Sequence, residues 1–126
     1  MKKVIKIILF LMISIFSLAA LKDGSYYVEG RSVAGWQPFL KLTVKNEKII
    51  GAQYDRKNAQ GQLLSIDQSG ISFRDASFAL SRSLIKTQDA NTIEDSKIPE
   101  LTREFKTMAN FLIEKANSGA TGNFTM

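Results

Sequence analysis

The strict alternation of apolar and polar side chains in Leu40-Lys41-Leu42-Thr43-Val44-Lys45 constrains the fold more than any other feature of this sequence. Successive side chains of a β-strand point to opposite faces, so this segment predicts a strand with one buried face. Asn46-Glu47 then reverses the chain into a second apolar segment at 48–55, which predicts an antiparallel hairpin. Pro38 lacks an N–H group and is therefore expected at the start of the strand or at a sheet edge.

A third strand is predicted before this hairpin. The segment 22–31 opens with an Asp-Gly turn signal and continues with aromatic and β-branched residues, which places Tyr26 and Val28 on one face. After the hairpin, residues 56–72 are rich in turn formers. We interpret them as a long connection with a short extended piece at 63–66.

Two helices are predicted in the C-terminal half of the chain. The first is capped by Asp75 and ends near Gln88, and a polar link at 89–97 follows it. Its apolar positions, one turn apart, are Ala76, Leu80 and Leu84.

The second helix has Pro99 in its first position and is stopped by Asn117-Ser118-Gly119. Its apolar stripe consists of Leu101, Phe105, Met108 and Leu112. Together these elements predict an α+β fold. A small antiparallel sheet, formed by the N-terminal strand and the hairpin, is covered by the two C-terminal helices.

The first 20 residues have the three-part pattern of a secretory signal peptide. Lysines at positions 2, 3 and 6 lead into an apolar run at 7–16, which is shorter than the roughly 20 residues that span a bilayer. Small residues at Ser17-Leu18-Ala19 provide a cleavage site. We predict a signal peptide at 1–20 and a single domain at 21–126, exported to a periplasm or to the cell surface and exterior. The alternative is an uncleaved anchor, through which alone the chain would then contact a membrane.

The net charge of +5 would suggest an anionic partner, but part of it lies in this leader. Removing the three leader lysines from 17 basic residues leaves 14 against 12 acidic ones, a net charge of +2. These charges are mixed in sign and form no long basic run that could follow a phosphate backbone. Nucleic acid is therefore not an expected partner.

The chain contains neither Cys nor His. Their absence excludes a disulfide framework, metal sites of thiolate or imidazole ligands, and His-dependent catalytic triads. Electron transfer by such a chain requires a borrowed cofactor.

The tetrapeptide Ser118-Gly119-Ala120-Thr121 resembles the attachment site of exported FMN-binding domains, which reads Asp-x-x-Ser/Thr-Gly-Ala-Thr. The segments 23–26 and 42–52 are also similar to the opening of such domains. The resemblance implies an FMN esterified to Thr121 by a flavin transferase, or held non-covalently against the sheet. It also implies electron exchange with a redox partner, so that the chain is an electron carrier or binding protein rather than a catalyst.

The chain departs from this family pattern in two ways. Lys115 stands where the family has the Asp of the motif, and Thr121 follows the last helix, whereas the family's motif precedes it. In the loop before the last helix, Asp89 and Thr92 match the motif, but Asp95 stands in the position of the acceptor Thr. Either the flavin is attached at a displaced site, or the chain is a surface or periplasmic module that binds a ligand or partner without covalent flavin.

Simpler interpretations exist both for the motif and for the aromatic residues. The segment 118–122 is also typical of a helix end followed by a loose C-terminus. Trp36, Tyr26 and Tyr27 could form a stacking wall for a planar ring, or they could be ordinary core and interfacial aromatics.

Overall fold

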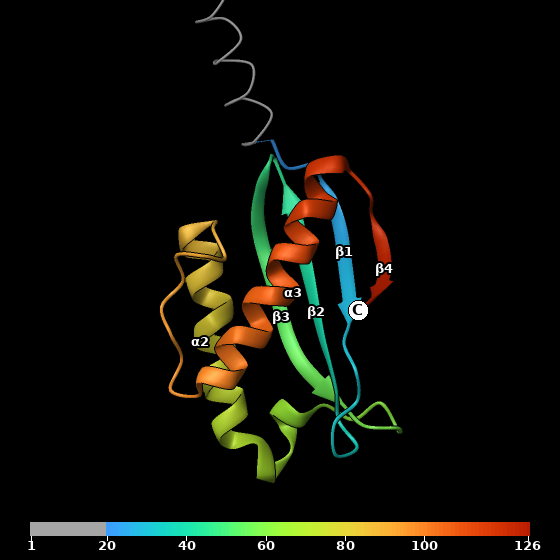
Figure 1. Ribbon diagram of the computed structural model, residues 1–126, viewed down its shortest axis with the longest axis vertical. Helices are drawn as coiled ribbons and strands as arrows, with labels where there is room; N and C mark the ends of the chain where they lie inside the picture. The colour runs from blue at the N-terminus through green and yellow to red at the C-terminus, as the bar shows by residue number, and fades with distance from the viewer. Residues whose placement is uncertain (1–19) are drawn as a thin grey trace, which may run out of the picture.

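The computed structural model describes residues 20–126 and confirms the α+β fold (Figure 1). The predicted signal peptide covers 1–20, and all but the last of these residues lie outside the described residues. The strands are β1 (Gly24–Glu29), β2 (Gln37–Lys45), β3 (Lys48–Lys57) and β4 (Gly122–Thr125). The helices are α2 (Ile71–Thr87) and α3 (Pro99–Ser118), preceded by two short 3-10 turns, η1 (Leu64–Ile66) and η2 (Gln68–Gly70).

The four strands form one sheet in the order β3-β2-β1-β4. The first three strands are antiparallel, as predicted, but β4 pairs with β1 in parallel, so the sheet is mixed. The sequence analysis missed β4 because Gly-Asn-Phe-Thr is too short to show an alternating pattern. Its extended form comes from docking on β1, between the pairs Tyr26–Gly122 and Glu29–Thr125. The C-terminus is therefore a strand and not a loose tail.

The alternation predicted for β2 is confirmed. Leu40, Leu42 and Val44 are all buried on the face that the helices cover, together with Tyr26 and Val28 of β1. Pro38 is the second residue of an interior strand, and its carbonyl accepts a hydrogen bond from the N–H of Gly30 at 2.9 Å. It therefore lies at a strand start, where its missing N–H breaks no pairing.

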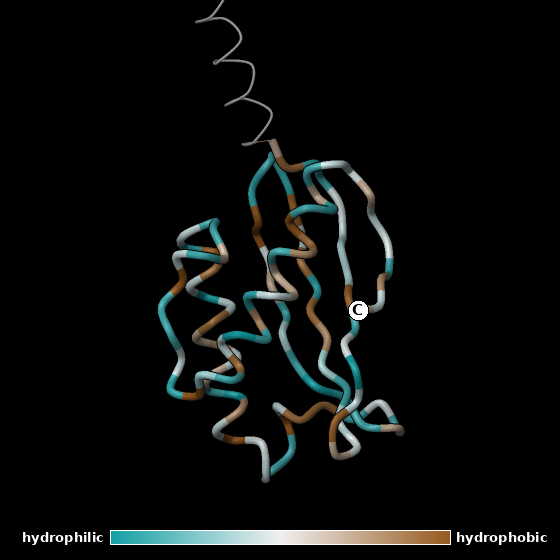
Figure 2. Tube along the Cα trace, in the orientation of Figure 1, coloured by the Kyte–Doolittle hydropathy of each residue, from teal (hydrophilic) through white to brown (hydrophobic). Residues whose placement is uncertain are grey.

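Both helices pack on one face of the sheet, with α3 crossing the strands and α2 lying beside β3 (Figure 1). Apolar segments of strands and helices face one another across this interface (Figure 2). The helical side chains of the core are Phe73, Ala76, Leu80, Leu84, Leu101, Phe105, Met108, Ala109, Leu112 and Ala116. The opposite face of the sheet has no helix of the described residues on it.

The predicted bounds of α3 are confirmed, since Pro99 begins the helix and Gly119 ends it in the left-handed conformation with φ 72°. The predicted start of α2 is wrong. The helix begins at Ile71, and Asp75 lies within it. No side chain caps α2 at Gly70. Asp67 instead caps η2, which leads directly into α2, by accepting a hydrogen bond from the N–H of Ser69.

Of the extended piece predicted at 63–66, only Leu63 is extended, in a bridge to Lys57; the rest of the prediction is wrong, because residues Leu64–Ile66 form η1. The carboxylate of Asp55 fixes this turn by accepting hydrogen bonds from the N–H of Ser65, at 3.1 Å, and from its hydroxyl. This contact joins residues distant in the sequence, so local pattern could not reveal it.

Candidate functional site

The segment Ser118-Gly119-Ala120-Thr121 connects α3 to β4 at the exposed surface. Ser118 is the last residue of α3, and its hydroxyl donates to the carbonyl of Lys115 at 3.0 Å. Gly119 takes the left-handed conformation that turns the chain out of the helix. The segment therefore forms a helix C-cap, as the simpler interpretation predicted.

The backbone N–H groups of this segment are already used within the cap. The N–H of Gly119 donates to Ala116, that of Ala120 to Lys115, and that of Thr121 to Gly119, over N–O distances of 3.0–3.3 Å. A phosphate bound by a Gly-rich loop needs such N–H groups free and directed toward it. This segment therefore does not fit a phosphate in the described conformation.

The side chain of Thr121 has two different surroundings. Its methyl group packs on the backbone of Gly24, where an added Cβ would lie 2.5 Å from Thr121 Cγ2. Its hydroxyl makes no hydrogen bond with any residue between 20 and 126. The hydroxyl is thus chemically available, although the backbone around it is not arranged to bind a phosphate.

The loop before α3 separates the other predicted site residues. Asp89 and Thr92 belong to one tight turn, in which the N–H and the hydroxyl of Thr92 both donate to the Asp89 carbonyl at 3.2 Å. The Asp89 carboxylate accepts from the N–H of Asn91 at 2.9 Å. Asp95 lies beyond this turn, 80 % exposed, with its carboxylate 3.9 Å from the ammonium group of Lys106. The loop therefore does not form a phosphate site from these three residues.

Asp95 instead borders a cleft of about 510 Å³ between α2 and the segment 95–98. This is a suitable size for a small organic ligand. Sequence reasoning did not find this cleft, because it pairs α2 with a segment some 20 residues later. Its lining residues are Ser72, Asp75, Ala76, Ala79, Asp95, Ser96, Lys97 and Ile98.

The wall of this cleft is held in place by Ser96. Its N–H donates to the hydroxyl of buried Thr102 at 2.9 Å, and its own hydroxyl donates to the carbonyl of Ile98 at 2.9 Å. These bonds tie the segment 95–98 to the first turns of α3. On the other side, Ala76 and Ala79 of α2 leave room because their side chains are small. The cleft is thus supported by two helices.

The three aromatic residues considered as a stacking wall do not share one face. Tyr26 is a core aromatic, and its hydroxyl donates to the carbonyl of Lys22 at 2.7 Å. Tyr27 lies on the opposite face of the sheet and stacks on Phe39, with ring centroids 5.6 Å apart. Trp36 is half-buried just before β2. None of the three lines the cleft beside Asp95.

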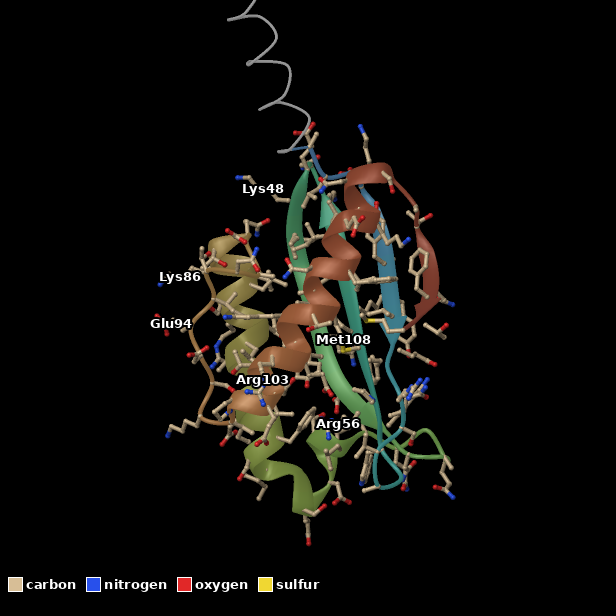
Figure 3. The ribbon with its side chains drawn as sticks, viewed as in Figure 1. Lys48, Arg56, Lys86, Glu94, Arg103 and Met108 are labelled. Atoms are coloured by element: carbon tan, nitrogen blue, oxygen red, sulfur yellow. The ribbon has the colours of Figure 1, made fainter. Side chains whose placement is uncertain are left out.

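A polar cluster between β3 and α3 escaped the sequence analysis. The Glu104 carboxylate accepts from both the Tyr54 hydroxyl and the guanidinium of Arg56, whose Nη2 lies 3.0 and 3.2 Å from the two oxygens. The guanidinium of Arg56, a residue labelled in Figure 3, also lies over the Phe73 ring, 5.5 Å from its centroid. Burial, and then the bond to Glu104, raises the pKa of Tyr54, so its hydroxyl stays a donor. The cluster links the sheet to α3, although the buried Nε of Arg56 has no hydrogen-bond partner among the described residues.

The part of the chain that the structure describes contains no group of three or more carboxylates placed to hold a metal ion. Within the same residues, no helix is both long and apolar enough to cross a bilayer.

Comparisons with known proteins identify the fold. No family model matches the sequence, and no curated protein matches it either. A crystal structure of a Clostridium perfringens protein is similar with a TM-score of 0.74 and 24 % identity, over 84 % of this chain and 97 % of the other. A solution structure from Clostridium thermocellum has a TM-score of 0.56 and 20 % identity, over 76 % and 92 % of the two chains. At these identities, the similarity establishes a shared fold and nothing about activity.

Proposed function

We propose that this chain is a ligand-binding domain that holds a small planar ligand, without a covalent bond, in the cleft between α2 and the segment 95–98. One observation supports the proposal above others. The cleft is lined by Asp95 and Ser96, and Asp95 stands where the FMN-binding domains that this sequence resembles carry their flavin acceptor. This correspondence in sequence supports a ligand site at the cleft, although the acceptor hydroxyl is missing.

The chemistry of the cleft favours a ring over a phosphate. Asp75 and Asp95 contribute carboxylates that accept hydrogen bonds from N–H donors, and Lys97 is the cation of the lining. Two carboxylates repel a phosphate group, while the small apolar residues of α2 suit a flat, uncharged heterocycle. Of the parts of FMN, the cleft therefore suits the isoalloxazine ring better than the phosphate. With that ring bound, the domain would be an electron carrier for a protein redox partner, because flavin supplies the redox chemistry.

A second candidate is covalent FMN at Thr121, the electron-transfer function that the tetrapeptide implies. The observation in its favour is the exposed hydroxyl of Thr121, which has no hydrogen-bond partner among residues 20–126. The bonded N–H groups around it count against this candidate. A flavin transferase would have to rearrange the cap before the ester could form.

One preparation distinguishes the two candidates. The full chain is expressed with a flavin transferase, purified and denatured, and its intact mass and absorption spectrum are recorded. For the proposed function we expect an unmodified mass and a colourless denatured chain. A mass increase of one FMN that is lost in Thr121→Ala would establish the second candidate instead.

Ligand binding is then measured directly. Riboflavin and FMN are titrated into the native chain, and flavin fluorescence is followed. Because Asp75 and Asp95 border the cleft, we expect riboflavin to bind at least about tenfold more tightly than FMN, which corresponds to about 1.4 kcal/mol. Asp95→Asn should reduce the difference in affinity between riboflavin and FMN. Glu114→Asn, which removes one negative charge at an exposed position of α3, should leave that difference unchanged. Absence of quenching by both flavins, with an unmodified mass, would exclude flavin as the ligand of the cleft.

A further inference from the structure

The outer edge of β3 is closed at both ends by the chain's own groups. At one end, the side-chain amide of Gln88 bonds to the N–H and the carbonyl of Ile49, each at 2.8 Å. At the other end, the hydroxyl of Ser77 donates to the carbonyl of Tyr54, and the N–H of Arg56 donates to the Asp55 carboxylate. These contacts satisfy edge groups that would otherwise be free to pair with another strand.

Between these two closures the edge is open at Ala52. Backbone groups of an antiparallel strand point alternately to its two neighbours. Since Tyr54 and Arg56 direct backbone groups outward, Ala52 does so as well, because it lies in the same phase of the strand. No hydrogen bond from a helix or loop between residues 20 and 126 reaches the N–H or carbonyl of Ala52. A backbone donor and acceptor are thus presented to the outside.

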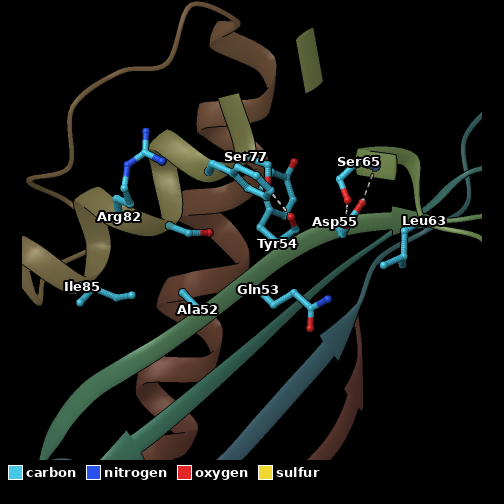
Figure 4. Close-up of a pocket in the computed structure, with 11 residues that line it drawn as sticks. Ala52, Gln53, Tyr54, Asp55, Leu63, Ser65, Ser77, Arg82 and Ile85 are labelled. Atoms are coloured by element: carbon cyan, nitrogen blue, oxygen red, sulfur yellow. Dashed lines mark hydrogen bonds between the residues drawn. The ribbon is translucent and has the colours of Figure 1, made fainter. Parts of the chain in front are cut away.

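A groove of about 370 Å³ lies directly beside this opening, between β3 and α2 (Figure 4). Its apolar lining includes Phe78 and Ile85, which lie about two turns apart on α2. Leu63, from the connection after β3, completes it. Phe78 is 48 % exposed and Ile85 is 37 % exposed, which is unusual for large apolar side chains that flank a strand edge. The groove therefore offers both apolar surface and an unpaired strand edge.

The exposed charge in the groove is positive. The carboxylate of Asp55 also lines the groove, but it is buried, and its oxygens already accept hydrogen bonds from Ser65 and from the N–H of Arg56. Arg82, which projects from α2 at the groove, is exposed and has no carboxylate within 4.0 Å among the described residues. A partner that carries a carboxylate at this point would complement it.

We propose that this groove binds an extended acidic peptide segment of another protein. The segment adds a short strand to β3 at Ala52, places an apolar side chain against Phe78 and Ile85, and directs a carboxylate to Arg82. Edge pairing supplies the main-chain hydrogen bonds, and the side-chain contacts supply selectivity, as in other complexes formed by strand addition. The site lies on the opposite flank of α2 from the ligand cleft, so it does not depend on the proposed function.

The probes are two acetylated hexapeptides, Val-Thr-Val-Glu-Val-Thr and the same sequence with Lys in place of Glu. Each is titrated into the ¹⁵N-labelled full chain, and amide shifts are followed by NMR. We expect the acidic peptide to shift amides of residues 51–53 and those around Phe78 and Ile85, and to bind about tenfold more tightly than the Lys peptide.

Two variants test the individual contacts. Arg82→Glu should reverse the preference between the peptides, whereas Arg103→Glu, the same charge change on exposed α3, should leave it unchanged (Figure 3). Ala52→Pro removes the outward N–H without breaking a bond to β2 and should weaken both peptides at least about fivefold. If Ala52→Pro does not fold, the peptide preference of Arg82→Glu tests the proposal by itself.

Three results would overturn the proposal. They are shifts that map away from β3 and α2, equal binding of the two peptides, or shifts at this groove that depend on protein concentration without any peptide. The last result would identify a second copy of this chain as the occupant.

Discussion

The side-chain amide of Gln88 hydrogen-bonds to both backbone groups of Ile49: Nε2 donates to the carbonyl and Oε1 accepts from the N–H. Gln88 therefore occupies the place of a neighbouring strand at this end of β3. The same residue ends α2 in the left-handed conformation, with φ 61°. One residue thus terminates a helix with its backbone and closes part of a sheet edge with its side chain.

Gln88→Asn separates these two roles. Asn tolerates the left-handed conformation better than Gln, but its shorter side chain cannot reach both backbone groups of Ile49. We expect a loss of about 1–2 kcal/mol in the free energy of unfolding, measured with urea. Gln60→Asn, at an exposed loop position, should change stability by less than about 0.5 kcal/mol. Unchanged stability of Gln88→Asn would mean that the two bonds contribute nothing net.

Gly24→Ala should destabilise the domain through its contact with Thr121. The new Cβ would lie 2.5 Å from Thr121 Cγ2, and φ of +150° at this position also disfavours a side chain. We expect a loss of about 1–3 kcal/mol. Thr121→Ser removes the methyl group, so a double-mutant cycle should recover part of the loss. If the effects of Gly24→Ala and Thr121→Ser on stability simply add, the loss in Gly24→Ala comes from backbone strain and not from the contact with Thr121.

The acid stability of the domain should depend on Glu29. The hydrogen bond from Lys57, followed by that from Tyr27, lowers the pKa of Glu29 below its ordinary value of 4.5. A lowered pKa in the folded state stabilises the protein above the unfolded pKa, and this stability is lost as the pH falls through the folded pKa. The urea midpoint should therefore decrease below about pH 4.5.

Glu29→Gln tests this cause. The variant should be less stable near neutral pH and should show a weaker decrease in acid. Glu114→Gln, which changes an exposed residue of α3, should retain the decrease of the unmodified chain. A profile for Glu29→Gln that parallels the original would assign the acid sensitivity to other carboxyl groups.

Phe124 should control whether β4 stays on the sheet. Its ring packs edge-on against Phe111, with centroids 5.7 Å apart, and the Lys115 ammonium lies 5.1 Å from the Phe124 centroid. Phe124→Ala should detach β4 and accelerate hydrogen exchange at β1 amides that face it, with a loss of about 1–2 kcal/mol in stability. Met126→Ala is the matched control at the same terminus. Unchanged exchange in β1 would show that backbone pairing alone holds β4.

The parts of the fold that depend on local pattern could be predicted, and those that depend on distant partners could not. The alternation at Leu40–Val44 and the Pro99–Gly119 bounds of α3 follow from burial and capping within one segment. The predicted start of α2 was wrong because the helix follows directly on η2, which Asp67 caps, so that Asp75 lies inside the helix. The cleft between α2 and the segment 95–98 was missed for the same reason, since Asp95 comes close to α2 only in the folded chain.

The pairing of β1 with β4 also fixes when this domain can complete its fold. The first strand of the domain has to wait for residues 122–125, so one sheet edge stays open until they have been synthesised. Contacts between segments so far apart in the sequence form slowly, since the long loop between them must first be closed. A ribosome that still holds residues 122–125 therefore keeps the domain one strand short of its native sheet.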